Sequence, residues 1–340
     1  MPEVLKILMV EDVQVSQVLN AAETAMRGSG HEVMRYRDSA ALWADKAALA
    51  QAEIFVFSSN FPCTRELLST PQRLRAVVVP AIGTETIDVP AATELGIIIA
   101  NGATPENVES MAESTVLLML ALLYDLNRSQ TLLRNRQPRP AELYAQMLKG
   151  RTIGLIGLGR IARAVVSRLE GWGVEFLAYT PRTSSTAVPR VITMVTLEEL
   201  LKQSDVVSIH ASLNDESRGM LNAERLRLLK PSAILIDTAR GGIIDEVALC
   251  EAVREKRIAG VALDTFAVEP LPADSPLREL PDAILTPHIV GHTVQGTRSL
   301  DTTVVENLMR VIRGEPPVHV RNPEVLPLWQ ARWSAATKSW

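Results

Sequence analysis

Cysteine is nearly absent from this 340-residue sequence, which contains only Cys63 and Cys250. Two cysteines argue against a disulfide framework and a metal cluster, so we expect each to be a small, buried or half-buried apolar residue. Long apolar runs are also lacking, because the longest, residues 116–123, is too short to span a bilayer. The N-terminus has no signal-peptide pattern, since residues 5–10 have the character of a strand. These absences predict a cytoplasmic protein without a metal site or a membrane contact.

Positive charge is not in excess either. The formal net charge is −4 and the pI is about 5.9, with lysines and arginines scattered along the chain. Scattered charge is typical of solvated faces and gives no sign of a nucleic-acid partner. Apolar residues are plentiful, at 47% with a mean hydropathy of +0.11, which is ample for two cores. A chain of this length favours two domains over one.

Short apolar segments alternate with helical patterns along most of the chain, which predicts parallel sheets and an α/β fold. In the first hundred residues, strands are expected at 5–10, 31–36, 54–57, 76–79 and 97–100, and helices at 40–50 and at 15–27, closed by Gly28. After Ala162, strands are expected at 175–179, 206–210, 234–237, 261–264 and 284–286. Helices are expected there at 197–202, 223–229 and 247–256, the last capped by Asp245.

Two long helices set the predicted domain organisation. Thr104 and Pro105 suit the start of the first, which is apolar around much of its circumference from Met111 onward and ends before Pro138. Such a helix packs between domains, in a subunit interface or in an ordinary core. The second spans 293–313 and returns the chain to the first domain, before an irregular proline-containing tail. We expect a substrate domain of residues 1–103, completed by 297–340, and a dinucleotide-binding domain of residues 104–296.

A glycine fingerprint follows the apolar run 152–156. Gly157, Gly159 and Ala162 form G-x-G-x-x-A between this strand and a helical pattern over 160–170. Gly157 permits a sharp turn, Gly159 lets the backbone approach a pyrophosphate, and Ala162 keeps the helix close to the strand. The N-terminus of that helix offers unpaired N–H groups to phosphates. This context favours dinucleotide binding over a simple surface turn, and no such fingerprint follows the first strand of the chain.

Polar residues lie where later strands meet their loops, the edge at which open parallel sheets collect ligands. Arg240 stands beside two glycines and either binds a small carboxylate or is a surface residue of a turn. Asp264 either accepts a hydrogen bond from a nicotinamide amide or caps a loop. His288 is either a structural histidine or, when paired with Glu269, a proton donor near neutral pH. The glycine turn at 82–84 is either an anion-binding nest or a plain turn.

Four segments together, in this order and spacing, match the motifs of one known family. They are the glycine fingerprint, the Arg-Gly segment, the Asp264…Glu269-Pro270 segment and the Thr-Pro-His segment. The whole chain resembles the D-isomer-specific 2-hydroxyacid dehydrogenases, and among them the NADP-type glyoxylate and hydroxypyruvate reductases. The resemblance implies two Rossmann-like, doubly wound parallel-sheet domains with a cleft between them, and a homodimer. It also implies that His288 is the acid/base, that Glu269 is its partner and that Arg240 binds the substrate carboxylate.

The same resemblance assigns the remaining site residues. Small 2-oxo or 2-hydroxy acids are expected to contact Arg240, His288 and the backbone amides of Ile82, Gly83 and Thr84. Contacts to NADP or NAD are expected from the following residues: Gly157, Gly159, Arg160, Ile161, Thr180, Arg182, Thr183, His210, Ala211, Thr238, Ala239, Asp264, His288 and Gly291.

One departure from the family pattern concerns the choice of cofactor. Where many NAD-using members have an aspartate after the second strand of this domain, the chain has Thr180. An aspartate there binds the ribose hydroxyls and repels a 2′-phosphate, so its loss removes that repulsion. Arg182, Thr183 and Ser184 then offer charge and hydrogen bonds to a phosphate, unless Arg182 is only a solvated loop residue or stacks on adenine. We therefore predict NADP(H) rather than NAD(H).

Further departures and alternatives stay open. Ser212 stands where the family usually has proline, and Glu85 either narrows substrate choice or points outward. His292 either lines the cleft or, as we expect, has a structural role and caps the helix from Thr293. Oxidation of phosphoglycerate or phosphite is an alternative activity, for which Arg65 is a possible phosphate contact. A non-catalytic, dinucleotide-binding corepressor is another alternative, and neither the 2-oxo acid nor the direction of reaction is fixed by the sequence.

Overall fold

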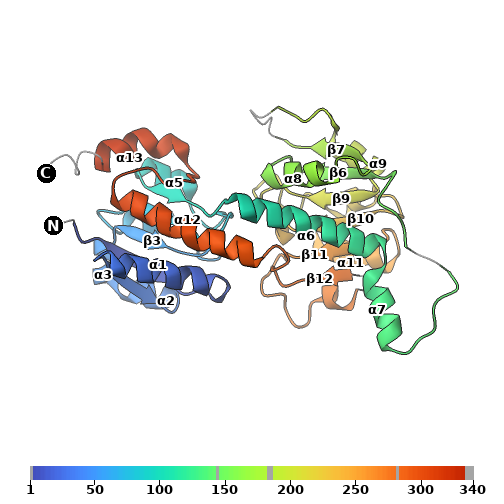
Figure 1. Cartoon of the computed structure of the whole chain (residues 1–340), viewed down its shortest axis with the longest axis horizontal. Coiled ribbons are helices and arrows are strands. Elements are labelled where there is room, and N and C mark those ends of the chain that lie inside the picture. Colours follow the sequence, from blue (N-terminus) through green and yellow to red (C-terminus); the bar gives the residue numbers. More distant parts are fainter. Residues whose placement is uncertain (1–2, 143–144, 182–186, 281–282, 334–340) are drawn as a thin grey trace. The chain divides into compact units, whose positions relative to one another are not determined.

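The computed structural model describes residues 3–142, 145–181, 187–280 and 283–333. The chain divides into two compact units (Figure 1), the first formed by Met1–Asn107 with Thr293–Trp340 and the second by Val108–His292. The boundaries expected from the sequence lie a few residues from these. Each unit is built on a sheet in which all the paired strands run parallel, which confirms the predicted α/β class.

The first unit has a five-stranded sheet in the order β2-β1-β3-β4-β5. Its strands are β1 (Lys6–Val10), β2 (Glu32–Tyr36), β3 (Ile54–Val56), β4 (Ala76–Val78) and β5 (Ile98–Ala100). Its helical segments are η1 (Val13–Val15), α1 (Ser16–Gly28), α2 (Ser39–Ala44), α3 (Lys46–Gln51), α4 (Arg65–Ser69), α5 (Val89–Glu94), α12 (Val294–Ile312), η4 (Pro323–Val325) and α13 (Leu326–Trp333).

Alternate residues along the strands of the first unit face two separate cores, as period-two side chains require. On one face, Ile7 packs with residues of α1, α12 and α13, among them the fully buried Trp329. On the other face, Leu8 packs with residues of α2 to α5, among them Leu49. Figure 1 shows α1 and α12 side by side, although they lie far apart in the sequence. Helices α12 and α13 therefore belong to the first unit.

The second unit has a seven-stranded sheet in the order β12-β11-β10-β9-β6-β7-β8. Its strands are β6 (Thr152–Ile156), β7 (Glu175–Tyr179), β8 (Ile192–Met194), β9 (Val206–Ile209), β10 (Ile234–Asp237), β11 (Gly260–Leu263) and β12 (Ala283–Leu285). Its helical segments are α6 (Pro105–Leu123), which begins in the first unit, α7 (Leu126–Arg134), α8 (Arg160–Leu169), α9 (Leu197–Gln203), α10 (Ala223–Leu226), η2 (Gly241–Ile243), α11 (Glu246–Arg254) and η3 (Pro276–Glu279).

Helices cover both faces of this second sheet. Leu155 lies in the core that α6 and α8 form on one face, and Leu235 lies in the core that α9, α10 and α11 form on the other. The order of the strands reverses at β6, with β9 on one side and β7 on the other. In sheets of this kind ligands bind at the carboxyl ends of the strands near such a reversal.

Several sequence-based boundaries are wrong for local reasons. The helix expected at 40–50 is two helices, because Asp45 ends α2 and its carboxylate caps α3. The long helix from Pro105 stops at Leu123, since Asp125 has a φ of +52° before α7. The tail is irregular only as far as residue 322 and then forms η4 and α13, and β8 was not predicted at all.

The closure of the first helix was also assigned to the wrong glycine. Gly28 is the last residue of α1, and the backbone turns left-handed only at Gly30, with a φ of +84°. Across the described ranges, none of the helices has both the length and the apolar character that crossing a membrane requires.

Candidate active site

The turn between β6 and α8 is shaped by two glycines. Gly157 has a φ of +93°, and a Cβ at this position would lie 2.8 Å from the backbone nitrogen of Ala211. A Cβ on Gly159 would meet nothing within 4 Å, so open space lies beside it. Gly159 is also the N-cap of α8 and makes no side-chain cap to the helix. The open space beside the N-terminus of α8 fits the pyrophosphate of a dinucleotide.

The loop after β9 packs against this turn through the backbone of His210 and Ala211. His210 shares a hydrogen bond of 3.0 Å between its Nε2 and Ser208 Oγ, and burial lowers its pKa to about 4. His210 is therefore neutral near pH 7. The half-buried Thr180 follows β7, while Arg182 and Thr183 lie outside the described residues. Arg160 and Ile161 begin α8, the first exposed and the second half-buried.

The turn that carries Arg240 follows β10. Asp237 ends this strand, and one of its carboxylate oxygens accepts a hydrogen bond of 2.8 Å from the N–H of Ala239. Arg240 is the N-cap of η2, and its Nη1 donates to the carbonyl of Ala239 at 2.6 Å. A Cβ on Gly241 would lie 2.1 Å from the carbonyl carbon of Phe266, so the turn packs directly against the backbone after β11. Only glycine allows this approach.

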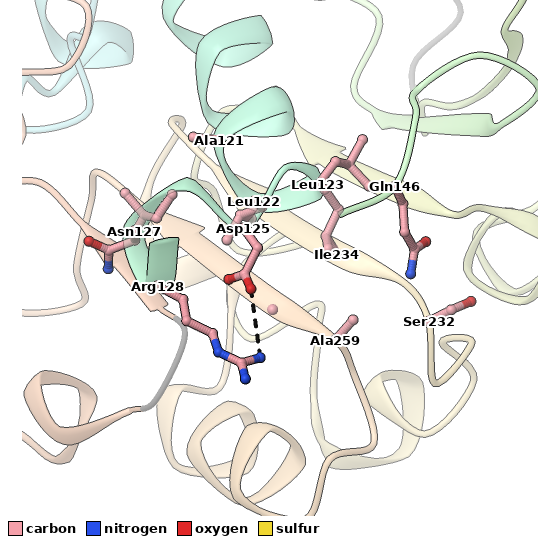
Figure 2. A pocket seen from close by; sticks show the side chains of 12 residues that line it. Ala121, Leu122, Leu123, Asp125, Asn127, Arg128, Gln146, Ser232, Ile234 and Ala259 are labelled. Atoms are coloured by element: carbon pink, nitrogen blue, oxygen red, sulfur yellow. Dashed lines mark ion pairs between the residues drawn. The ribbon is translucent and has the colours of Figure 1, made fainter. Parts of the chain in front are cut away.

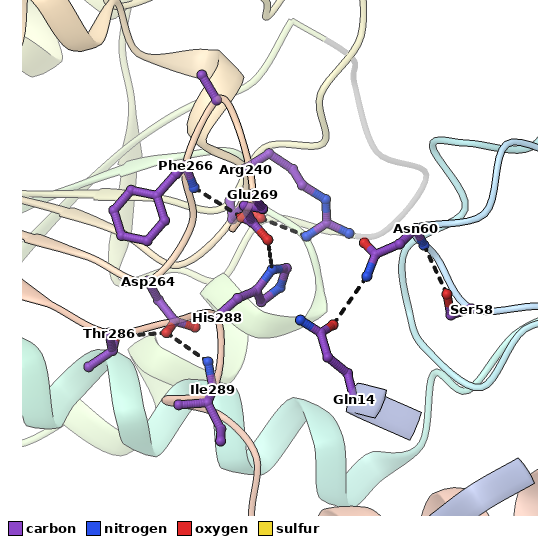
Figure 3. A network of polar contacts seen from close by, with 12 residues as sticks. Gln14, Ser58, Asn60, Arg240, Asp264, Phe266, Glu269, Thr286, His288 and Ile289 are labelled. Carbon is purple, nitrogen blue, oxygen red and sulfur yellow. Dashed lines mark hydrogen bonds and ion pairs between the residues drawn. The ribbon is translucent and has the colours of Figure 1, made fainter. Parts of the chain in front are cut away.

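Glu269 and His288 form a close pair (Figure 3). Glu269 Oε2 lies 2.7 Å from His288 Nδ1, and the other carboxylate oxygen accepts from the N–H of Phe266 at 3.0 Å. The two side chains are 27% and 31% exposed, respectively, so both are within reach of a ligand. Because Nδ1 is bonded to Glu269, Nε2 is the ring nitrogen that can exchange a proton with a substrate.

The charges of this pair stabilise each other. The hydrogen bond to Glu269 raises the pKa of His288 above its usual value, against the opposing effects of burial and of the charge on Arg240. Burial alone would raise the pKa of Glu269, but hydrogen bonds from His288 and from the Phe266 N–H leave it lowered. Arg240 acts electrostatically on both groups, and Figure 3 shows its side chain beside Glu269. The fold therefore brings a guanidinium, a carboxylate and an imidazole together within one unit.

Asp264 organises the loop that carries His288. Its Oδ1 accepts hydrogen bonds from Thr286 Oγ1 at 2.7 Å and from the N–H groups of Ile289 and Val290 at 2.9 and 3.1 Å. These bonds hold His288 at a φ of +53°, in the left-handed region. Of the two roles considered for Asp264, capping the loop is therefore present in the structure, and contact with a nicotinamide stays a prediction.

Helix α6 holds the far end of the same loop. Ser110 Oγ donates to the carbonyl of Gly291 at 2.7 Å, and a Cβ on Gly291 would lie 1.8 Å from Met111 Sδ. The N–H of His292 bonds to the carbonyl of Ile289, and burial lowers the pKa of His292. The side chain that caps α12 is Thr293, not His292.

The predicted substrate loop lies in the first unit, after β4. Gly83 and Thr84 are buried, whereas Ile82 is half-buried and Glu85 is exposed. Two residues that the sequence did not predict hold this loop. Asn101 Nδ2 donates to the carbonyl of Ile82 at 2.8 Å, and Arg321 Nε donates to Thr84 Oγ1 at 3.2 Å. Arg321 lies more than two hundred residues away in the sequence, so no local pattern links it to Thr84.

A cavity of about 180 Å³ lies elsewhere in the second unit (Figure 2). Its lining includes Ile234 and Gly260, at the amino ends of β10 and β11, and the ion pair between Asp125 and Arg128. Since the polar residues described above follow the carboxyl ends of these strands, this cavity is at the opposite edge of the sheet. It belongs to the junction of α6 and α7 and not to the candidate active site.

Known proteins resemble this chain in sequence and in fold. Residues 116–290 match the family model described as D-isomer specific 2-hydroxyacid dehydrogenase, NAD binding domain. A glyoxylate reductase from Thermofilum pendens is 38% identical over 269 residues, which cover 77% of this chain and 78% of that protein. A D-3-phosphoglycerate dehydrogenase from Methanocaldococcus jannaschii is 34% identical over 281 residues, which cover 82% of this chain and 53% of that protein. The crystal structure of a glyoxylate reductase from Paecilomyes thermophila has a TM-score of 0.83 at 25% identity, covering 95% of this chain and 100% of that one.

The fold and the family model together define a nicotinamide-dependent oxidoreductase. The chain belongs to the D-isomer specific 2-hydroxyacid dehydrogenase family, which confirms the resemblance drawn from its motifs. It spans about half the length of the phosphoglycerate dehydrogenases that it matches.

Proposed function

We propose that this enzyme reduces a small 2-oxo acid to the D-2-hydroxy acid, with His288, Glu269 and Arg240 as its catalytic residues. The observation that carries the proposal is the 2.7 Å contact between His288 Nδ1 and Glu269, with Arg240 acting on both. An imidazole whose pKa is raised by a carboxylate suits a general acid near neutral pH. A guanidinium beside it suits a carboxylate and a polarised carbonyl on the same small molecule.

Each residue has a defined part in this proposal. Protonated His288 donates from Nε2 to the substrate carbonyl oxygen as negative charge develops there, and Glu269 stabilises the imidazolium. Arg240 binds the substrate carboxylate. The glycine turn and the N-terminus of α8 bind the pyrophosphate of the cofactor, whose nicotinamide supplies the hydride. In the oxidative direction, neutral His288 accepts the proton from the hydroxyl.

For the substrate, we favour small 2-oxo acids such as glyoxylate and hydroxypyruvate. The Thermofilum pendens relative is named a glyoxylate reductase and is matched over most of its length, whereas the phosphoglycerate dehydrogenases are matched over about half of theirs. Arg65, considered as a phosphate contact, is paired with Glu94 on the surface of the first unit. The test is kcat/KM for glyoxylate, hydroxypyruvate, pyruvate and phenylpyruvate, with 3-phosphoglycerate as the competing substrate. A preference for 3-phosphoglycerate would overturn this choice.

For the cofactor, we propose NADP(H). The support is Thr180, which stands where an aspartate would repel the 2′-phosphate. Measuring kcat/KM with NADPH and with NADH on the same 2-oxo acid decides the question, and a clear preference for NADH contradicts the proposal. A Thr180→Asp variant should move the preference towards NADH, because the new carboxylate repels the phosphate and accepts from the ribose hydroxyls.

We also propose that the protein is a homodimer, joined through α7. None of the residues of this helix is buried, and two of its large apolar side chains, Leu126 and Leu133, are 47% and 81% exposed. Leu117 and Tyr124, on the adjoining part of the chain, are 56% and 52% exposed. An apolar surface of this kind is typical of an interface, and a second copy of the chain presents the same surface to it. Light scattering should show a dimer that Leu133→Glu weakens, and a monomeric parent protein would contradict the proposal.

A further inference from the structure

Asp237 is a fully buried carboxyl group that the activity proposed above does not use. It ends β10, and its side chain is 0% exposed. One oxygen, Oδ1, accepts from the N–H of Ala239 at 2.8 Å, and the carboxyl also accepts from the backbone N–H of Arg240. The other oxygen, Oδ2, has no hydrogen-bond partner among the described residues. The carboxyl therefore holds the Arg240 turn with one side and has nothing to stabilise a charge on the other.

The surroundings of Asp237 offer little compensation for a negative charge. Asp264 follows the neighbouring strand β11, and its N–H donates to the carbonyl of Asp237 at 2.9 Å. From this neighbouring position the negative charge of Asp264 disfavours a second charge on Asp237. On the other side, β9 ends opposite Asp237 and is followed by His210, which is neutral near pH 7. From α6, the hydroxyl of Thr115 faces Thr238 at 3.3 Å and carries no charge. Among the residues that the structure describes, Arg240 is the one cation whose charge acts on Asp237.

We propose that Asp237 is a positioning residue of the carboxylate-binding turn, whose carboxyl group carries a proton on Oδ2 while Oδ1 holds the backbone of Ala239 and Arg240. A buried, unpartnered carboxylate oxygen is much more costly than a neutral carboxylic acid in the same place. In agreement with this geometry, burial raises the pKa of Asp237 to about 7, against the hydrogen bonds from Ala239 and Arg240. The group therefore exchanges its proton in the range in which enzymes of this kind work.

Loss of that proton changes the charge that a substrate meets. Ionised Asp237 places a buried negative charge beside Arg240, which reduces the attraction of Arg240 for an anionic 2-oxo acid. The KM for the substrate should therefore rise as pH increases through about 7. The turn itself stays in place, because the N–H groups of Ala239 and Arg240 bond to either form of the carboxyl. The inference rests on the proposed role of Arg240 for its effect on substrate, but not for the protonation state itself.

The protonation state is tested without any activity measurement. The infrared carbonyl stretch of a buried carboxylic acid is separate from the bands of carboxylates, so it should be seen at about pH 5 and fade by about pH 9. Asp237→Asn should remove this band, because the amide cannot ionise. Asp205→Asn is the matched control: Asp205 lies at the other end of the sheet, and its pKa is lowered, against burial, by the Thr152 N–H and Lys230. A parent protein without the band, or an Asp237→Asn variant that keeps it, overturns the proposal.

Thermal unfolding gives an independent measure with opposite signs for the two variants. The folded-state pKa of Asp237 is raised, so the parent protein loses stability as pH rises from the unfolded value of about 3.9 towards 7. The Tm of Asp237→Asn relative to the Tm of the parent should therefore increase as pH rises over that window. For Asp205 the folded-state pKa is lowered, so the stability that its carboxylate contributes is lost as pH falls. The Tm of Asp205→Asn should therefore lie closest to that of the parent at low pH and fall below it as pH rises. Equal slopes for the two variants contradict the inference.

The positioning role is tested on substrate binding. The KM for glyoxylate in the parent enzyme should rise roughly three- to tenfold from about pH 6 to about pH 8, the scale of one partly screened unit charge. Asp237→Asn should remove that rise and keep the low-pH KM, whereas Asp237→Ala, which lacks the acceptor, should raise KM at every pH. A rise of KM in Asp237→Asn equal to that of the parent overturns the role. If neither the parent enzyme nor any variant reduces a 2-oxo acid, the proposed function fails. The infrared result still decides whether Asp237 is protonated.

Discussion

The two units of this protein place different turns after the first strand of each sheet in sequence, β1 and β6. In the second unit, β6 leads through Gly157 and Gly159 into α8, whose N-terminus has no side-chain cap. In the first unit, β1 leads to η1, and the carboxylate of Asp12 accepts from the N–H of Gln14 at 2.9 Å. The turn after β6 places no carboxylate at the start of its helix, whereas the turn after β1 occupies the N–H of Gln14 with the carboxylate of Asp12. The plan of strand, turn and helix is shared, so the turn decides which unit can bind a dinucleotide.

The same contrast is present in two histidines. His31, in the first unit, has a pKa lowered by burial, and its Nδ1 accepts from the N–H of Leu5. His288, in the second, has a pKa raised by Glu269 and can be protonated near neutral pH. At His31 the effect of burial outweighs the charge of Glu53, whereas at His288 a hydrogen bond to Glu269 outweighs burial and produces a candidate acid.

The largest expected effect comes from replacing each of these two histidines in turn by glutamine. His288→Gln should lower kcat for reduction of a 2-oxo acid by about 10²–10⁴, because the general acid is lost. His31→Gln should leave kcat within about twofold, since independent sites do not couple. Steady-state kinetics on both variants, with circular dichroism as a check of folding, makes the comparison. Near-normal reduction by the His288 variant would remove that residue from its proposed role.

The turns themselves are tested by adding a single methyl group. Gly157→Ala forces a side chain into the left-handed region and against the backbone of His210 and Ala211, a strain of about 1–3 kcal/mol. If the cofactor-binding turn has to absorb that strain, the Kd for NADPH should rise roughly ten- to a hundredfold. Gly28→Ala is the matched change in the first unit, where a Cβ meets nothing within 4 Å, and it should leave that Kd unchanged. Calorimetric titration with NADPH measures both, and equal affinities would show that Gly157 does not shape the cofactor site.

The sequence was informative where a pattern is local. The fingerprint at Gly157 and the apolar strands predicted the α/β class, and the order of its motifs predicted the family. It was less informative where distant residues meet. The contact between Arg321 and Thr84, and the packing of Gly241 on Phe266, join segments whose spacing carries no signal. The role of Asp237 also depends on burial of one oxygen, which no sequence pattern specifies.

Helix breaks were missed for a related reason. The helical pattern over 40–50 continues through Asp45, and only its side-chain bond to the N–H of Ala48 marks the start of a new helix. Near Tyr124, the apolar pattern gives no warning of the left-handed Asp125 that separates α6 from α7. Such breaks are decided by single backbone conformations, to which the periodicity of side chains is insensitive.

A smaller effect is expected from the partner of His288. In Glu269→Gln the hydrogen bond that raises the pKa of His288 is weakened, so this pKa falls. Because reduction requires the protonated imidazole, the decline of kcat/KM with rising pH should begin at a lower pH than in the parent. Oxidation of the 2-hydroxy acid requires the neutral form, so its rising limb should move in the same direction. A pH–rate profile unchanged by the substitution would mean that Glu269 does not set the protonation of His288.

The smallest effect concerns the carboxylate that occupies the turn of the first unit. Asp12→Ala removes the cap on η1 and should cost about 1 kcal/mol of stability, like Asp245→Ala at the N-terminus of α11. Urea unfolding followed by tryptophan fluorescence measures the loss in the first unit, in which Trp43 and Trp329 lie. The variant should not gain affinity for phosphate, because this turn has no glycine to bring the backbone close to an anion. Phosphate binding by Asp12→Ala would mean instead that a single negative charge, rather than the path of the backbone, separates the two turns.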